Sequence, residues 1–216
     1  MSRMPEPPQD ASLREQLSGM IERLPEGNLP LGGLLDQFGD EGLLLLTVFL
    51  TLIFLIPVSI PGVSTAFGAA ILLVGLSRLR NKPLWLPRKL RAREVSTTRL
   101  RPALERGLTW VRRMEAVSRP HRLPRLAGGG AIGVFNNLVF ILAAMLLMAP
   151  FGLVPFSNTL PALALLLFAV GFIQRDGGAV LLGHLASLAT LIYFGVLVGG
   201  GSLMVREMIS RYWPGG

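Results

Sequence analysis

Small hydrogen-bonding side chains stand beside prolines at two places in an otherwise apolar sequence. Proline and glycine interrupt the helical pattern there, at Pro57, Pro61, Gly62, Pro155 and Pro161. Backbone amides released at such breaks, together with hydroxyl and amide side chains, can coordinate an ion or an anionic headgroup. Six side chains are therefore candidate substrate- or ion-binding residues: Ser59, Ser64, Thr65, Ser157, Asn158 and Thr159. The alternative interpretation is that they only satisfy backbone groups released by the prolines.

The sequence offers little support for other kinds of chemistry. Glycosidic-bond chemistry normally requires two facing carboxylates, and the carboxylates beyond residue 41 form no close pair in sequence. The run GGGAIG at 128–133 lacks the lysine of a phosphate loop, which favours close helix packing instead. The absence of cysteine excludes disulfides and Cys-based metal sites. We expect no catalytic residue, metal or cofactor, and predict that the chain is not an enzyme.

Two ionisable residues of the second half are candidates for proton-linked chemistry, namely His184 and Asp176. As a single residue in an apolar stretch, His184 is interpreted first as a hydrogen-bonded packing group. Arg175 and Asp176 are interpreted first as an adjacent ion pair that ends a helix, with Gly177 and Gly178 making the turn.

The composition of this 216-residue chain indicates where these residues lie. Hydrophobic residues make up 51% and charged residues only 16%, below the roughly 25% of ordinary soluble domains. Such values disfavour a disordered chain and nucleic-acid binding. They predict an all-α, polytopic membrane protein, which we place in the bacterial inner membrane.

The net charge of +8 is concentrated in one block. Residues 1–41 carry a net charge of −5, whereas residues 78–126 hold 15 Lys and Arg against 3 Glu. A basic block between apolar segments marks the cytoplasmic side and favours anionic lipid headgroups as partners, with no nucleic acid. The sequence therefore predicts that residues 78–126 lie in the cytoplasm.

Six segments position the candidate residues. They are acidic amphipathic helices over 1–41, a first broken or re-entrant apolar repeat over 42–78, a basic cytoplasmic or interfacial segment with an amphipathic helix over 79–126, a second broken or re-entrant repeat over 127–176, a transmembrane helix over 177–205 and a tail over 206–216. Within the first, Pro30 and Gly39 bracket a short helix. The stretch 177–205 is long enough to cross a core of about 30 Å.

The two broken stretches resemble each other. Aligning Gly75 with Gly171 brings the two proline and hydroxyl breaks nearly into register. One interpretation is an internal repeat, inverted as in many transporters; the other is chance similarity between apolar segments. We expect the two breaks to meet near mid-membrane. If the repeat holds, Ser64 and Thr65 should approach Ser157 and Asn158.

Close packing between protein copies is a further expectation. Gly195 and Gly199 have the small-xxx-small spacing that lets membrane helices approach closely. Together with Gly133 and Ala143 in the preceding apolar stretch, they favour a homodimer.

Short motifs occur in a consistent order between residues 12 and 205. They are GDEGL at 39–43, PGVST at 61–65, KPLWLP at 82–87, RRME at 112–115, PFSNTLPA at 155–162 and GFIQRDG at 171–177. This set resembles the ExoD family of bacterial membrane proteins. The resemblance implies a role in exopolysaccharide synthesis, which names a pathway and not a reaction.

The predicted function joins the breaks to that pathway. We expect a transporter-like component that moves an ion, a lipid-linked precursor or another small solute through a site at the paired breaks. The alternatives are a scaffold that anchors polysaccharide-synthesis enzymes through its basic segment and, third, an enzyme acting on lipid-linked sugar. The resemblance makes exopolysaccharide-synthesis proteins candidate partners.

Overall fold

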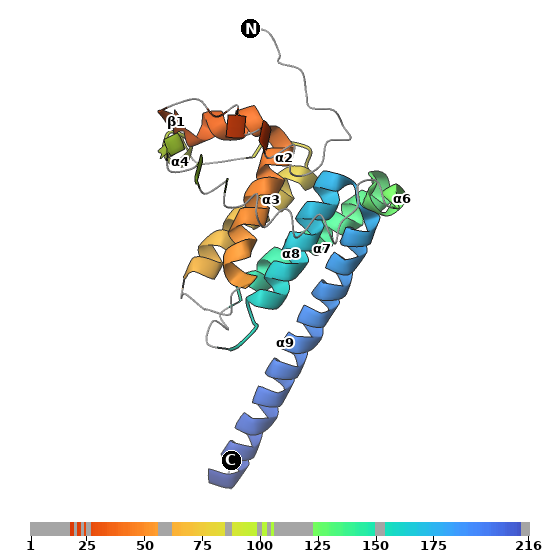
Figure 1. The fold of residues 1–216 in the computed structure, drawn as a ribbon. Helices are drawn as coiled ribbons and strands as arrows, with labels where there is room; N and C mark the ends of the chain where they lie inside the picture. Colours follow the sequence, from red (N-terminus) through yellow and green to blue (C-terminus); the bar gives the residue numbers. More distant parts are fainter. Residues whose placement is uncertain are drawn as a thin grey trace.

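The computed structural model describes residues 18–19, 21–22, 24, 27–55, 62–84, 88–98, 101–102, 105, 123–149 and 154–212. The elements are β1 (Asn28–Pro30), α2 (Leu31–Leu52), the 3-10 turn η1 (Ile53–Leu55), α3 (Val63–Leu79), α4 (Arg88–Arg91), β2 (Glu94–Ser96), α6 (Pro124–Ala127), α7 (Gly130–Leu147), α8 (Thr159–Gln174) and α9 (Gly177–Tyr212). The long helices α2, α3, α7, α8 and α9 form a bundle, and β1 and α4 lie beside the start of α2 (Figure 1). The prediction of a helical protein is confirmed.

The helix α2 bends where it enters the bundle. Gly39 has φ of 56° and ψ of −149°, so two helices meet at this residue. The first follows Pro30, which confirms the predicted short helix between Pro30 and Gly39. The other helix expected within 1–41 and the amphipathic helix expected within 79–126 lie largely outside the described residues.

A short β-ribbon departs from the all-α prediction. β1 pairs antiparallel with β2, with Leu29 opposite Val95. The Thr97 hydroxyl donates to the Gly27 carbonyl, which extends the contact by one step. Strands of three residues are too short for an alternating pattern to be visible in sequence. The ribbon ties the chain before α2 to the basic segment.

Two helical hairpins make up most of the bundle, and their turns lie at the same end (Figure 1). The first consists of α2, η1 and α3, and the second of α7 and α8. Between them, α3 packs on α7 with Gly68 against Met148 and Gly75 against Ile141. A Cβ at Gly75 would lie 2.7 Å from Ile141 Cγ1, so this approach requires glycine. The order of the two contacts makes α3 and α7 antiparallel.

Two apolar clusters hold the hairpins together. One joins α2 to α8, and its main members are Leu44, Leu45, Val48, Leu166, Ala169, Val170 and Ile173. The other joins α3, α7 and α8 around Phe140 and Phe168, whose rings meet edge to face with centroids 6.4 Å apart. Both clusters therefore include packing between the two hairpins.

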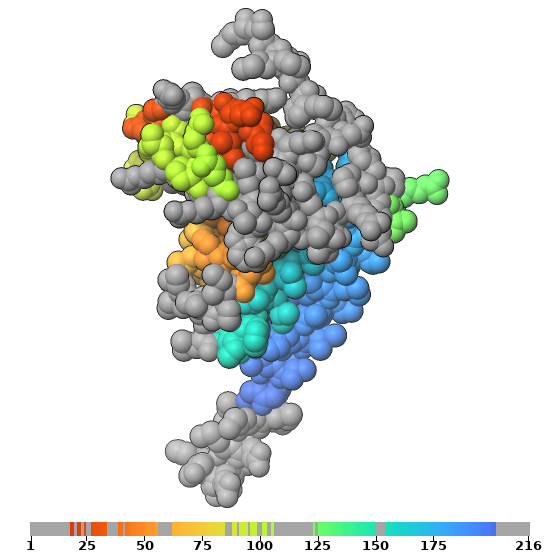
Figure 2. Space-filling model, in the orientation of Figure 1, coloured from red at the N-terminus to blue at the C-terminus, as the bar shows by residue number. Residues whose placement is uncertain are grey.

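Two helices are long and apolar enough to cross a membrane, namely Gly130–Leu147 and the Gly177–Gly201 part of α9. Both expose large apolar side chains: Ile132, Val134, Phe135, Leu138, Met145, Leu181, Leu182, Leu185, Leu188, Leu191, Ile192, Val196 and Val198. α9 forms a ridge along one edge of the molecule (Figure 2). It continues to Tyr212, so residues 206–212 of the expected tail are helical. An apolar surface of this extent is typical of contact with lipid or another protein.

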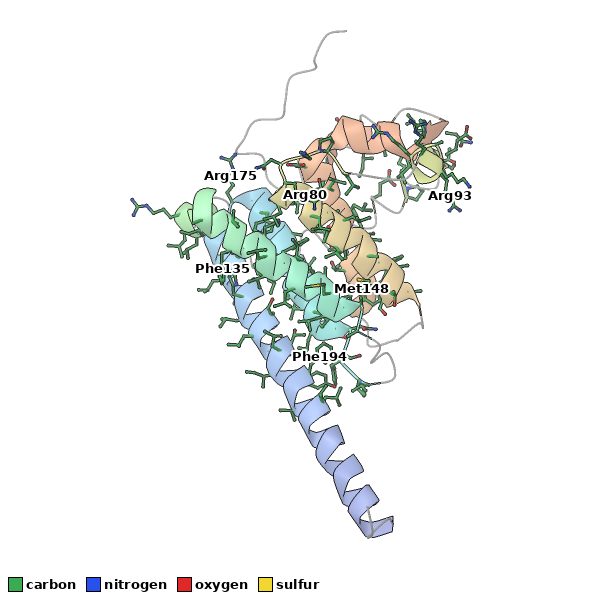
Figure 3. The ribbon with its side chains drawn as sticks, turned by 180° about the vertical axis from the view of Figure 1, so that it is seen from behind. Arg80, Arg93, Phe135, Met148, Arg175 and Phe194 are labelled. Carbon is green, nitrogen blue, oxygen red and sulfur yellow. The ribbon has the colours of Figure 1, made fainter. Side chains whose placement is uncertain are left out.

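Basic residues gather at the other end of the bundle. Arg80, Arg93 and Arg175 lie at the end away from the hairpin turns, whereas Met148 lies near the second turn (Figure 3). The shorter apolar helices Gly42–Leu55, Val63–Leu79 and Thr159–Gln174 carry the chain between these two ends. The bundle therefore has a basic end and an end formed by the breaks.

Candidate functional site

The polar residues of the two breaks differ in exposure. Ser157 is 1% exposed, and Ser64 and Asn158 are each 7% exposed. Thr159 is half-buried and Thr65 is exposed. The remaining candidates, Ser59, Pro57 and Pro61, lie outside the described residues. Burial thus singles out Ser64, Ser157 and Asn158 from the predicted set.

The second break is a turn between two separate helices. α7 ends at Leu147 and α8 begins at Thr159, with Pro155 in the turn and Pro161 in the first turn of α8. Phe156 takes a φ of 63°, a left-handed conformation that is uncommon outside glycine. The Tyr193 hydroxyl of α9 donates to the Pro155 carbonyl. α9 therefore braces the turn that carries Ser157 and Asn158.

The first break ends in a left-handed glycine. Gly62, with φ of 83°, precedes α3 and lies in the left-handed region. Both breaks adjoin one apolar cluster, since Phe54 before the first break is packed with Leu147 and Ala162 on either side of the second. Phe54 also meets Phe67 of α3 edge to face at 5.9 Å. Described residues that flank the two breaks thus belong to one apolar cluster at one end of the bundle.

His184 is part of a polar junction among α6, α7 and α9. Asn136 is 2% exposed, and its Nδ2 donates to the Leu126 carbonyl at 2.7 Å. That bond leaves Asn136 Oδ1 as the acceptor 2.8 Å from His184 Nε2, so Nε2 carries the proton. The ring stacks on Phe135 and meets Phe168 edge to face, with centroids 5.2 and 4.9 Å away. This geometry supports the packing interpretation of His184.

Asp176 caps α9. Its carboxylate Oδ1 accepts a hydrogen bond of 2.8 Å from the Gly178 backbone amide, and the residue is 1% exposed. Arg175, with φ of 50°, ends α8. The turn therefore falls at Arg175 and Asp176, while Gly177 and Gly178 lie inside the helix and not in the turn as expected. Gly177 has a packing role there, because an added Cβ would collide with the Leu123 carbonyl.

A cavity of about 680 Å³ lies at the basic end. Its walls are the end of α3, the glycine-rich start of α7 and the end of α8. The polar and aromatic lining residues are Arg78, Asn81, Asn137, Phe172 and Arg175. Because α3 and α8 both run from the breaks toward this end, the cavity and the breaks lie at opposite ends of the bundle.

Two groups in this cavity have unused hydrogen-bonding capacity. Asn137 is 6% exposed, and its Nδ2 donates to the Gly75 carbonyl at 2.8 Å. Its buried Oδ1 has no hydrogen-bond partner among the described residues, and the same holds for the buried Nε of Arg78. The Arg78 guanidinium lies 4.9 Å from the centre of the Phe172 ring. Phe172 thereby holds this cation at the cavity wall.

Sequence reasoning missed the cavity and its asparagines. Asn136 and Asn137 are adjacent amides in a stretch of 49 residues without Asp, Glu, Lys or Arg. Polar residues in such stretches are costly and generally functional or paired, so this signal was available. The expected close helix packing is not seen at Gly133: an added Cβ there would lie 2.7 Å from the carbonyl oxygen of Gly128, five residues earlier in the same segment, and would meet no atom of another helix among the described residues.

Comparisons with known proteins give the chain its family. Residues 13–196 match the family described as "Exopolysaccharide synthesis, ExoD". The chain belongs to the ExoD family. It is 46% identical over 202 residues to Protein ExoD of Rhizobium meliloti, covering 94% of this chain and 83% of that protein. It is 29% identical over 170 residues to an uncharacterized protein of Synechocystis sp., covering 78% and 73%. No solved structure matches the chain.

Proposed function

We propose that this member of the ExoD family is a polytopic inner-membrane protein whose two hairpins enter and leave by the cytoplasmic face. The exposed apolar side chains of α7 and α9 support contact with lipid. The basic residues gathered at the end opposite the hairpin turns support the orientation, because Lys and Arg favour the cytoplasmic side.

Helix lengths set how deep the hairpins reach. α7 has 18 residues, α3 has 17 and α8 has 16, so each is about 24–27 Å long at 1.5 Å per residue. The hairpins therefore cross most of a hydrocarbon core of about 30 Å. The breaks lie near its far side and not at mid-membrane. The 25-residue apolar part of α9 crosses completely.

The orientation of the hairpins bears on the internal repeat. Both hairpins begin with a helix leading away from the basic end and finish with a helix returning to it (Figure 1). A two-fold axis parallel to the helices relates hairpins that point the same way. We therefore propose a parallel repeat in place of an inverted one.

We further propose a transporter-like role in exopolysaccharide synthesis, with a polar site at the paired breaks. The observation that carries it is the burial of Ser64, Ser157 and Asn158 beside the starts of α3 and α8. Buried hydroxyl and amide groups next to helix N-termini are suited to hold a small anionic or dipolar solute. Membership of a family described by exopolysaccharide synthesis supports the pathway.

The decisive experiment is a flux assay on purified protein in liposomes, with ion and pH gradients tried first. Asn158→Leu, which keeps the side-chain volume, should reduce both flux and exopolysaccharide output in a strain lacking the wild-type gene. Thr65→Val is the control at the other break: its hydroxyl is exposed and so falls outside the buried set Ser64, Ser157 and Asn158, and its loss should leave both activities unchanged. Absence of flux together with a stably co-purifying synthase supports the scaffold function instead.

A further inference from the structure

The cavity at the basic end combines three sources of positive potential. Arg78 and Arg175 approach it from the ends of α3 and α8. The third source is the start of α7, an 18-residue helix whose N-cap is Gly129 and whose first turn has no side-chain cap. The first backbone amides of a helix and its dipole both favour an anion. Gly128, Gly129 and Gly130 line the cavity at this point, and these three residues place no side chain over the amides.

Negative charge near the cavity is limited. Asp40 of α2 interacts electrostatically with Arg78, while the lining residues themselves include no carboxylate. Asp176 follows Arg175 in the chain, and its Oδ1 accepts a hydrogen bond from the Gly178 amide. Two guanidinium groups therefore have two neighbouring carboxylates within the described residues, and neither carboxylate lines the cavity. A guanidinium presents several N–H donors in a plane, which matches the oxygens of a phosphate.

Asn137 supplies the observation that points to a ligand. Asn137 lines the cavity and is only 6% exposed. Its side-chain Oδ1 has no hydrogen-bond partner among the described residues. The bond from its Nδ2 to the Gly75 carbonyl fixes which atom is the free acceptor. A buried acceptor of this kind requires a donor. The matching ligand is an anion that also carries a hydroxyl or ammonium group.

We propose that this cavity binds a phosphate group bearing such a donor, held by Arg78, Arg175 and the first amides of α7. Two sources share this chemistry: the headgroup of an anionic lipid and a free phosphate or phosphate ester. The site lies at the opposite end of the bundle from the breaks, so it does not rest on the proposed transport role. Absence of flux would count against the transport role, whereas failure of phosphate to bind would count against the cavity proposal, so the two failures can be told apart.

The test uses the full-length protein purified in detergent with two probes. Inorganic phosphate is titrated by calorimetry, and phosphatidylglycerol is compared with phosphatidylcholine by native mass spectrometry. Arg175→Asn removes one cation, and asparagine tolerates the left-handed φ of 50° found there. We expect it to weaken binding by about tenfold, as befits one charge-assisted contact. Arg78→Gln should act similarly, and thermal unfolding checks that each variant is folded.

Arg80→Gln is the matched control, because Arg80 is exposed at the same end and is not among the cavity-lining residues. The Arg80→Gln variant should bind each probe within about twofold of wild type, because Arg80 does not line the cavity and an exposed charge outside a site contributes little. Binding of inorganic phosphate that depends on Arg175 supports a free phosphate ligand. Retention of phosphatidylglycerol alone, with the same dependence, supports a lipid headgroup. Failure of both probes to bind, or equal weakening by Arg80→Gln, overturns the proposal.

Discussion

Replacing Asn136 by leucine tests the polar junction at which α6, α7 and α9 meet. The side chain is 2% exposed, donates to the Leu126 carbonyl and accepts from His184. Leucine has a similar volume, so the change removes both hydrogen bonds while leaving the packing volume nearly unchanged. The perturbation therefore isolates polar energetics from cavity formation.

The expected size follows from the two bonds. Hydrogen bonds between membrane helices contribute about 0.6 kcal/mol on average and up to about 1.7 kcal/mol. Asn136→Leu should accordingly lower the free energy of unfolding by about 1–3 kcal/mol. His184→Phe removes only the shared bond and keeps a ring against Phe135 and Phe168. It should cost about 0.6–1.7 kcal/mol.

A double-mutant cycle measures the shared bond. Wild type, the two single variants and the double variant are unfolded reversibly in mixed micelles with increasing fractions of denaturing detergent. Because both single changes remove the same Asn136–His184 bond, the double variant should be more stable than additivity predicts, by about 0.6–1.7 kcal/mol. Strict additivity, within about 0.3 kcal/mol, would refute the direct bond between these side chains.

Three other predictions address topology, packing and association. Because the chain has no cysteine, a single introduced cysteine reports on which side of the membrane its position lies. Arg93→Cys should react with an impermeant thiol reagent only from the cytoplasm. Phe156→Cys, at the hairpin end, should react only from the periplasm. Gly177→Ala should lower stability by about 1–3 kcal/mol because its Cβ meets Leu123 and Leu126, and an unfolding curve at wild-type midpoint contradicts this. We expect a homodimer that associates through Gly195 and Gly199, so Gly195→Leu should lower the mass of the particle in mild detergent to that of a protomer. The protomer should stay folded, since an added Cβ at Gly195 meets nothing within 4 Å among the described residues. An unchanged mass in light scattering argues against association through this face.

Local signals in the sequence anticipated the helices better than their arrangement. Pro30, Gly39 and Pro155 mark real helix ends because proline and glycine act on the backbone where they stand. Nothing in the periodicity indicates that α2 packs on α8 and α3 on α7, because each helix is apolar over most of its circumference. Pairing of this kind depends on close approaches such as Gly68 to Met148, which only tertiary geometry reveals.

The candidate site, like the fold, was predictable from local sequence signals only in part. Pro155 and its neighbours identified the second break, since a helix cannot continue through such a run. The partition of Ser157 and Thr159 into buried and half-buried groups depended on the final packing and had no local signal. The cavity near Asn137 is formed by residues about 60 positions apart in the chain, as the Asn137 bond to Gly75 illustrates. Hydrophobic periodicity is a local signal, so it does not predict contacts between residues that are this far apart in the chain.

The common direction of the two hairpins has a consequence for biogenesis. In the proposed topology, the stretches 42–77 and 126–174 that enter the bilayer contain no Asp, Glu, Lys or Arg. Arg206, Glu207 and Arg211 are then the charged side chains that must be carried across the hydrocarbon core during insertion. Each charge at the centre of a membrane helix costs about 2.5–3.5 kcal/mol on insertion scales. Both hairpins thus enter the bilayer without that penalty, and export of charge is confined to the last few turns of α9.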